Sequence, residues 1–390
     1  MRLNTLSLLL IFSFTVSLAQ NQKLGVVVDA ESKAPLEFVD VYNTQDNTAS
    51  NADGAFFFIS ELDSIIAYKV GYEELRTTFK DVQDTIYLKP SAFKLNEVIL
   101  TNTKTLWDKV RDSIPKHYMF TPFKERFFLR CLLRQNAKIV RIQDIEGKLR
   151  RKTLIYRQGM ESSLKDFSFE ISNMRKIGVN KDENKVYFTF FSLSELLFET
   201  IRLNATGDGF TLTEKEYENE NRAKIFFQSD TTIVGLNTSG HYIINNDSKA
   251  IEAFVMQSKI DRDKYFKNGP VRSRTIGVEQ TVNFTRSTKW NKHFITSAKI
   301  IYTVEITHTK KSFKDIYTCE YILQTFDNNE DFAFESNVNA EKDIFKLKHD
   351  YNPEFWENQN KLLLTGEMED FISGFDSKKN PFKSRRNRKN

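Results

Sequence analysis

The feature of this sequence that most constrains its fold is a series of segments in its second half, within each of which apolar and polar residues alternate. Between residues 222 and 326 the segments are RAKIFFQS, TTIVGLN, GHYIIN, KAIEAFVMQSKI, EQTVNFTRSTKW, HFITSAKIIYTVEITH and DIYTCEYILQTF. A period of two places one side of each segment on a buried face, and short polar turns pair neighbouring strands antiparallel. We therefore expect an antiparallel sheet of at least six strands, with a tight turn at Asn246-Asp247-Ser248.

The rest of residues 120–375 extends this β-rich domain. ERFFLRCLLR and AKIVRIQDIEG predict two further strands, and Phe188 to Phe198 predicts a strand followed by a helix. Ahead of them, residues 103–118 predict a linker helix, because Leu106, Val110 and Ile114 recur every four residues and Pro115 is expected to end it. A few helical turns are also expected around Met368, Phe371 and Ile372.

Residues 22–100 indicate a separate, smaller β-domain. Leu24, Val26 and Val28 alternate, and Asp53-Gly54 forms a turn signal before a strand that begins at Phe56. Short strands follow one another at intervals of about 8–12 residues, which is typical of a small β-sandwich.

This segment resembles the carboxypeptidase-regulatory-like family. The matching positions are Gly25, Val27, Asp29, Pro35-Leu36, Val39, Gly54-Ala55-Phe56, Gly71-Tyr72, Leu88, Leu95, Glu97 and Val98. It departs from the family at Glu37 and Asn51, where a small residue and a threonine are usual. The resemblance implies a prealbumin-like (transthyretin-like) sandwich that accompanies a catalytic domain or the plug of a TonB-dependent receptor without doing chemistry itself.

A second, weaker resemblance concerns the hairpin around Gly240. Gly240, Tyr242 and Ile244, then a turn and Ala250-Ile251, are similar to a hairpin of half-barrel envelope proteins, among them carriers of acyl chains. It implies a half-barrel-like second domain; a generic curved antiparallel sheet is the alternative. The predicted fold class is thus mainly β, with a few helices.

The two ends of the chain predict its compartment. Arg2, the apolar run from Leu6 to Val16 and the small residues Ser17 and Ala19 match a signal peptide over residues 1–19. We expect an exported protein, periplasmic or associated with an outer membrane. Residues 376–390 carry most of the excess positive charge behind the net +5. They are expected to be a basic disordered tail or an electrostatic tether, and the mildly acidic remainder argues against nucleic acid as a partner.

Cys131 and Cys319 each fall on the apolar side of a predicted strand. We expect both to face the core. In an exported protein they form either a disulfide or two buried thiols, and no CxxC spacing suggests a metal or redox site.

No catalytic, cofactor or metal motif is found in the sequence. None of the histidines (His117, His241, His293, His308, His349) has a glutamate at the spacing of a zinc peptidase. His293 and His308 could meet across a sheet, but we expect them to be surface imidazoles. Carboxylates cluster at Asp261/Asp263, Glu216/Glu218/Glu220 and Asp327/Glu330/Asp331, and the last group could hold calcium through oxygen ligands. All three are expected to be solvated loops, so catalytic, cofactor-binding and metal residues are predicted as none.

These features favour a non-enzymatic, exported envelope protein that binds or has a structural role, with an unknown protein, glycan or lipid partner and a possible link to outer-membrane (TonB-dependent) uptake. One alternative is a carrier of a lipophilic ligand, whose cavity would be lined by Phe226, Ile233, Tyr242, Ile244 and Phe254. A second alternative is a divergent hydrolase, which a cleft that gathers two carboxylates, or histidine with glutamate, would favour.

Overall fold

Two small sheets packed face to face make up the N-terminal part, called the sandwich below. The computed structural model describes residues 20–92, 105–156, 160–178, 186–201, 209–216, 221–230, 234–287, 289–359 and 361–375. One small sheet has the order β4-β1-β7 and the other β3-β2-β5-β6. Their strands are β1 (Asn21–Asp29), β2 (Asp40–Tyr42), β3 (Asn47–Ala49), β4 (Ala55–Ser60), β5 (Ser64–Tyr68), β6 (Leu75–Thr78) and β7 (Thr85–Leu88).

The interior of the sandwich follows from the alternation in its strands. Val27, Val41, Phe56 and Ile65 are fully buried between the two sheets. Gly54 has a positive φ of 74°, and a Cβ there would lie 2.4 Å from the carbonyl oxygen of Val27, so the predicted Asp-Gly turn needs its glycine. The family positions Leu95, Glu97 and Val98 lie outside the described residues, as do the predicted signal peptide and basic tail.

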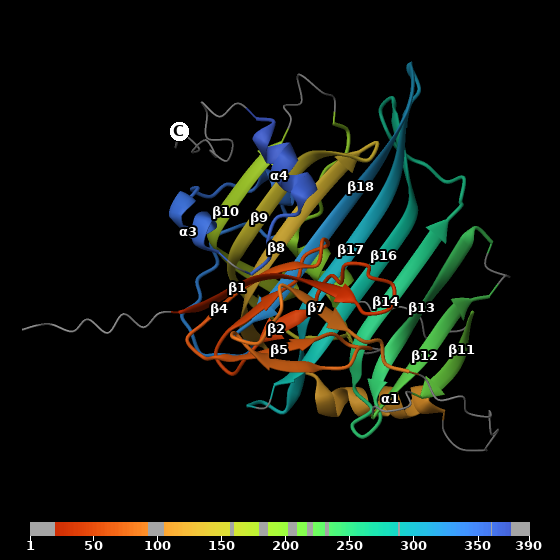
Figure 1. The fold of residues 1–390 in the computed structure, drawn as a ribbon. Helices are drawn as coiled ribbons and strands as arrows, with labels where there is room; N and C mark the ends of the chain where they lie inside the picture. The colour runs from red at the N-terminus through yellow and green to blue at the C-terminus, as the bar shows by residue number, and fades with distance from the viewer. Residues whose placement is uncertain are drawn as a thin grey trace, which may run out of the picture.

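The second part is built on one large sheet of eleven strands (Figure 1). Its order is β10-β9-β8-β18-β17-β16-β14-β13-β12-β11, with β15 paired to β16, and every pairing is antiparallel. The strands are β8 (Phe123–Gln135), β9 (Lys138–Arg151), β10 (Phe167–Gly178), β11 (Phe210–Glu216), β12 (Arg222–Ser229), β13 (Leu236–Asn245), β14 (Ile251–Ile260), β15 (Phe266–Asn268), β16 (Val271–Ser287), β17 (Lys292–His308) and β18 (Lys311–Phe326).

The large sheet joins two consecutive runs of hairpins, β8 to β10 and β11 to β18. The last strand, β18, pairs with the first, β8, so that Cys319 lies opposite Leu133 and Tyr321 opposite Cys131. The predominantly β architecture, with a small sandwich ahead of a larger antiparallel sheet, agrees with the prediction.

One face of the large sheet, which we call the apolar face, carries Phe127, Tyr242, Ile300 and Tyr321. It is covered by α1 (Leu106–His117), by α2 (Leu193–Ile201) and by two irregular segments at 186–191 and 338–347. Trp107 of α1 lies 4.7 Å from the Tyr242 ring, and Phe191 stacks on Tyr321 at 5.6 Å. Around these rings the apolar face is a core filled by aromatic packing, and a recess of about 430 Å³ remains at one end of it, beside Phe188, Phe191 and Tyr302.

The opposite face, called the charged face below, carries Arg130, Asp144, Lys299 and Glu320. Asp144 is completely buried and accepts hydrogen bonds from Arg130 at 2.9 Å and Arg175 at 2.8 Å. These two guanidinium groups hold the pKa of Asp144 below its usual value even though burial acts in the other direction.

Three elements cover the charged face: the sandwich, α3 (Pro353–Asn358) and α4 (Gly366–Ser373), which lie on the same side of the sheet in Figure 1. Phe38 of the sandwich, in a left-handed conformation with φ of 57°, packs with Phe128 and Trp356. Lys299 bridges Glu37 of the sandwich, at 2.8 Å, and Glu320 of the sheet, at 2.9 Å. Val70 of the sandwich also packs against Ile243 and Ala253 of the sheet, so apolar contacts, an ion pair and hydrogen bonds together dock the sandwich.

Several expectations about local structure need correction. Pro115 does not end α1, which continues to His117, because a proline in the last turn removes only one helical hydrogen bond. No strand precedes α2: residues 186–191 are irregular, and their aromatic rings pack onto the sheet instead of alternating. Of the predicted strand TTIVGLN, residues 231–233 lie outside the described residues, Val234 and Gly235 form a turn, and Leu236 and Asn237 begin β13. The Asn246-Asp247-Ser248 turn is confirmed.

Cys131 and Cys319 are both fully buried on the apolar face, as expected. They are free thiols and not a disulfide. Burial raises the pKa of both thiols, so they act as packed apolar groups. Among the described residues, no helix has the length and apolar character needed to cross a membrane.

Candidate functional site

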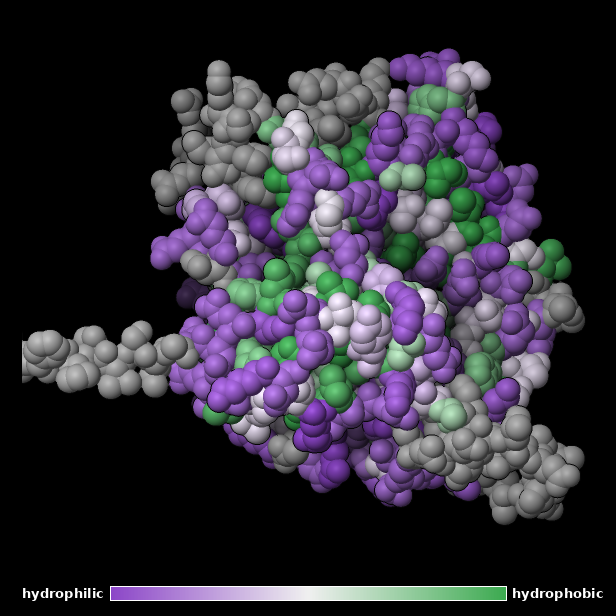
Figure 2. Space-filling view, viewed as in Figure 1, coloured by the Kyte–Doolittle hydropathy of each residue, from purple (hydrophilic) through white to green (hydrophobic). Residues whose placement is uncertain are grey.

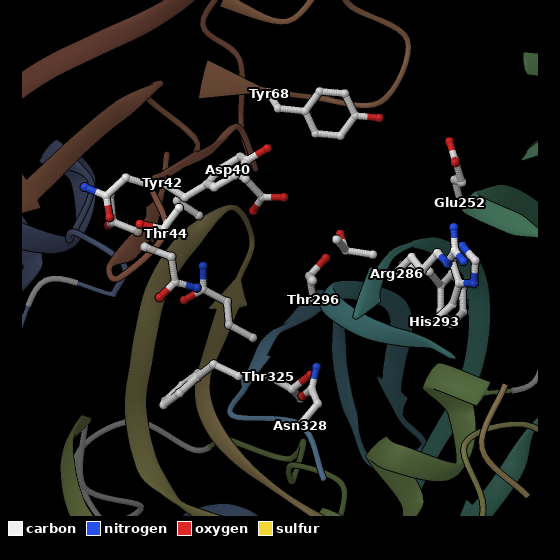
Figure 3. Close-up of a pocket in the computed structure, with 18 of the residues that line it drawn as sticks. Asp40, Tyr42, Thr44, Tyr68, Glu252, Arg286, His293, Thr296, Thr325 and Asn328 are labelled. Carbon is white, nitrogen blue, oxygen red and sulfur yellow. The ribbon is translucent and has the colours of Figure 1, made fainter. Parts of the chain in front are cut away.

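A cleft of about 850 Å³ lies where the sandwich meets the charged face of the large sheet. Residues of β2, the β2–β3 turn and β5 form one wall, and residues of β12, β14, β16, β17 and β18 form the other wall and the floor. Figure 3 shows Asp40, Tyr42 and Thr44 on one side, Glu252, Arg286 and His293 on the other, and Tyr68 above an open space. In the space-filling view, hydrophilic residues predominate on the sandwich and on the strip of sheet beside it (Figure 2).

The sandwich wall is held in place by Asn43. Its side-chain oxygen accepts from the backbone N–H groups of Gln45 and Asp46 at 2.9 Å, and its amide nitrogen donates to Ser60 Oγ at 2.8 Å. An asparagine that bonds its own turn in this way fixes the backbone from residue 43 to residue 46. The β2–β3 turn therefore presents a defined polar edge to the cleft.

The opposite wall is tied to the sandwich through Arg222. This guanidinium donates to Glu252 Oε2 at 2.5 Å and to the Tyr68 hydroxyl at 2.8 Å. Asn245 donates to the other oxygen of Glu252 at 3.1 Å. Arg222 thus bridges β12, β14 and β5 across the end of the cleft.

The floor holds buried polar atoms without a partner. His293, which is 3% exposed, and Gln324, which is 8% exposed, line the cleft, and so does Asn328. Within the described residues, His293 Nδ1, Gln324 Oε1 and Asn328 Oδ1 have no hydrogen-bond partner. A buried polar atom left unpaired costs about 1–3 kcal/mol, so three of them along one cleft require an explanation.

All three unpaired atoms are hydrogen-bond acceptors. Burial lowers the pKa of His293 to about 4, so the ring is neutral at physiological pH; it bonds the backbone of His117 and leaves Nδ1 unprotonated. Gln324 and Asn328 offer amide oxygens.

Asp40 adds a carboxyl group on the opposite wall. Burial raises its pKa to about 7, and Lys69 only partly offsets this shift. Within the described residues Asp40 makes no side-chain hydrogen bond. A smaller recess of about 340 Å³ continues from Asp40 and Tyr68 to His241, whose pKa burial lowers to about 3.

The overall charge of the cleft is acidic. Asp40, Asp46, Glu74, Asp247, Glu252 and Asp327 line it, against Arg222, Arg286 and Lys361. Carboxylates, amides and hydroxyls on both walls, together with the aromatic rings of Tyr42, Tyr68 and Phe326, can accept hydrogen bonds from a ligand and stack against it. An anionic ligand would be repelled.

The residues named for a lipophilic cavity do not surround one. Tyr242, Ile244 and Phe254 are fully buried on the apolar face, where Tyr242 and Phe254 pack at 5.0 Å. Phe226 pairs with His241 on the opposite face, and Ile233 lies outside the described residues.

The histidines are distributed differently from the sequence expectation. His293 and His308 lie at opposite ends of β17 and do not meet. Instead, His293 is within 6.0 Å of His117, ring to ring, and is buried and not at the surface. No group of three histidine, cysteine or carboxylate residues suited to a metal is found in the part of the chain that the structure describes.

Where the structure describes them, the carboxylates of the predicted acidic loops form ion pairs or are exposed to solvent. Asp327, Glu330 and Asp331 are each paired with a cation: Arg126, Lys289 and Lys124 respectively. Asp261 and Asp263 are exposed, and the side chains of Glu216, Glu218 and Glu220 lie outside the description.

The cleft could not be recognised in the sequence because its residues come from seven separate segments between residues 40 and 361. Polar residues in the alternating strands, such as Gln324 and Thr296, have the pattern of solvent-facing positions, although the sandwich lies over that side. The Asn43 turn and the histidine at the start of β17 were the available signals, and neither is specific.

Comparison with known proteins gives no identification. No protein-family model matches the chain, and no curated protein matches it. A solved structure described as "Lipid-protein interactions in lipovitellin" is similar at a TM-score of 0.23 and 6% sequence identity, over 58% of this chain. The chain covers 27% of that protein's length. A TM-score this low supports no argument about fold or function.

Proposed function

We propose that this chain is an exported, non-catalytic protein of the cell envelope that binds a polar ligand in the cleft between its sandwich and its large sheet. The observation that carries the proposal is the cleft itself: about 850 Å³, with walls from both parts of the chain. Binding sites concentrate at such junctions between domains, and this volume lies within the range of about 300–1,000 Å³ typical of ligand sites. The sandwich, which resembles a regulatory accessory, supplies one wall in keeping with a binding role.

Ligand screening on the full chain tests this proposal. Melting temperature is measured against polar metabolites, peptides and oligosaccharides, and binders are expected to stabilise the folded state increasingly, with the logarithm of ligand concentration above the Kd. Thr44→Trp places a large ring at the cleft edge and should abolish the stabilisation. Thr309→Trp, on an exposed turn at the far end of β17, serves as the matched control. Ligands that bind equally well to both variants would place the site elsewhere.

Association with an outer-membrane uptake receptor is the partner we propose for the sandwich. The resemblance of residues 22–100 to domains that precede receptor plugs supports it. Affinity purification of the tagged protein from solubilised envelopes should recover a receptor, and recovery of none would count against this partner.

A divergent hydrolase is the second candidate, and the protonation of Asp40 favours it. A carboxyl group with a pKa of about 7 can donate a proton near neutral pH, and the same cleft also holds the carboxylates of Asp46 and Asp247. Incubation of the protein with oligosaccharides should then release shorter products, and Asp40→Asn should abolish their release. Binding without turnover in the unmodified protein would reject the hydrolase.

A further inference from the structure

We infer that the ligand of the cleft is an uncharged or amino-bearing oligosaccharide whose hydroxyl groups donate to His293, Gln324 and Asn328. This inference rests on the proposed function and names its ligand class. The three side chains come from the start of β17, from β18 and from the turn that follows β18. All lie at one end of this strand pair, so they can contact one ligand.

Strand pairing and buried neighbours hold two of the acceptors, Gln324 and His293, in place, and Asn328 follows in the turn after β18. Gln324 lies opposite Ser297 in the β17–β18 ladder, and the Thr325 hydroxyl donates to the carbonyl of Ile295. Tyr118, whose hydroxyl donates to the Ile251 carbonyl at 2.7 Å, packs against the His293 ring. Groups held by sheet backbone and buried neighbours keep their geometry without a ligand, which favours binding.

The chemistry of the unpartnered atoms defines what they bind. An unprotonated ring nitrogen and two amide oxygens all accept hydrogen bonds, so the complementary ligand must offer donors. Sugar hydroxyls offer many donors at close spacing, and an ammonium group offers three. A phosphate or carboxylate offers none and would face the acidic side chains of the cleft.

The size and aromatic content of the cleft agree with this class. About 850 Å³ exceeds what a single sugar ring fills, so an oligosaccharide fits better than a monosaccharide. Tyr42 and Tyr68 on the sandwich and Phe326 on the sheet supply flat apolar surface, which suits the C–H faces of sugar rings.

Calorimetric titration of the full chain with neutral cellohexaose, mannohexaose and chitohexaose, and with anionic polygalacturonate, tests the inference. At least one neutral oligosaccharide should bind, and polygalacturonate should not. Gln324→Met, His293→Phe and Asn328→Leu each remove one acceptor at similar size and should weaken binding about tenfold.

Gln324→Met and Asn328→Leu should also raise the melting temperature of the free protein, whereas His293→Phe also removes the bond between the ring and the backbone of His117 and is tested by affinity alone. An acceptor that has no partner destabilises the unliganded fold, so its apolar replacement relieves that cost while it removes a contact to the ligand. Tyr242→Phe is the matched control. The Tyr242 hydroxyl is also buried without a partner among the described residues, but it lies on the apolar face, so its removal should leave oligosaccharide affinity unchanged.

The outcomes separate this inference from the proposed function. Preferential binding of polygalacturonate, or neutral binding that all three acceptor variants leave unchanged, would overturn the oligosaccharide assignment. If Thr44→Trp blocks the binding seen in either of these two outcomes, the cleft is still a binding site, but for another class of ligand. If no ligand in the wider screen is sensitive to Thr44→Trp, the cleft is not a site and both proposals fail.

Discussion

The two faces of the large sheet are made by the same strands, yet they are buried in different ways. The apolar face is covered by aromatic and aliphatic side chains from α1, α2 and two irregular segments. The charged face is covered by the sandwich through ion pairs such as Lys299 with Glu37 and Glu320, and it retains a cleft of about 850 Å³. Hydrophobic and dispersion interactions have no preferred direction, so apolar side chains pack closely against one another. Ion pairs and hydrogen bonds require particular distances and angles, so a polar interface can leave unfilled space between its contacts.

This difference indicates which face provides stability and which provides a site. Apolar burial supplies most of the free energy of folding, and the apolar face leaves only a recess of about 430 Å³ at one end, against about 850 Å³ for the cleft. A polar interface between two parts contributes less stability and leaves hydrogen-bonding groups available. Substitutions on the two faces should therefore differ in how much they change the free energy of unfolding and in how far their effects spread through the structure.

The largest effect is expected on the apolar face. Phe127 is fully buried and its ring lies 5.7 Å from Phe169, so Phe127→Ala removes a large side chain from a packed core. We expect the free energy of unfolding in urea to fall by about 3–5 kcal/mol. The control is Phe266→Ala: Phe266 is 73% exposed, and its loss should cost less than about 0.5 kcal/mol. Equal losses for the two variants would contradict the comparison.

A smaller and more local effect is expected between sandwich and sheet. Lys299→Met leaves Glu37 and Glu320 without their shared cation, and because the pair is partly exposed the cost should be about 1–2 kcal/mol. Hydrogen exchange should rise in residues 36–41 and stay unchanged in strands that carry the apolar face. Lys310→Met, at an exposed turn, is the control. Faster exchange throughout the sheet would show that the charged face supports the whole fold.

The smallest effect concerns pH. The pKa of Asp40 is raised to about 7 in the folded protein, so the folded state binds more protons than the unfolded chain between about pH 4 and pH 7. This group's contribution to stability should therefore decline as pH rises through that window and level off above it. Asp40→Asn should remove the decline, a change of about 1 kcal/mol after allowance for solvent in the cleft. Denaturation at pH 5 and pH 8 measures it, and an unchanged pH slope in Asp40→Asn would contradict the assignment.

Much of the architecture could be predicted from residue patterns, because a period of two is local information. The hairpin of β13 and β14 and the long strands β16 to β18 follow the alternation closely. β10 was missed because Asn173, Arg175 and Lys176 interrupt its apolar alternation; Arg175 is paired with the buried Asp144. A charge whose partner lies on another strand looks like a surface residue in the sequence.

The cleft could not be predicted in the same way. Its polar residues alternate as solvent-facing positions would, and nothing local indicates that the sandwich covers them. The position of the sandwich depends on contacts such as Phe38 with Trp356 and Glu37 with Lys299, which join residues hundreds of positions apart. Glu37 accepts hydrogen bonds from Lys299 through both of its carboxylate oxygens, so this one side chain helps to fix the position of the sandwich.

The pairing of β8 with β18 also has a consequence for how the chain folds. Partners such as Leu133 and Cys319 are about 190 residues apart, so the two runs of hairpins cannot join until the last strand has been synthesised. Until then β8 exposes an unpaired edge that carries Phe127, Leu129 and Cys131. A chain with such high contact order should fold slowly. It should also depend on chaperones that shield this edge while the remainder of the polypeptide emerges.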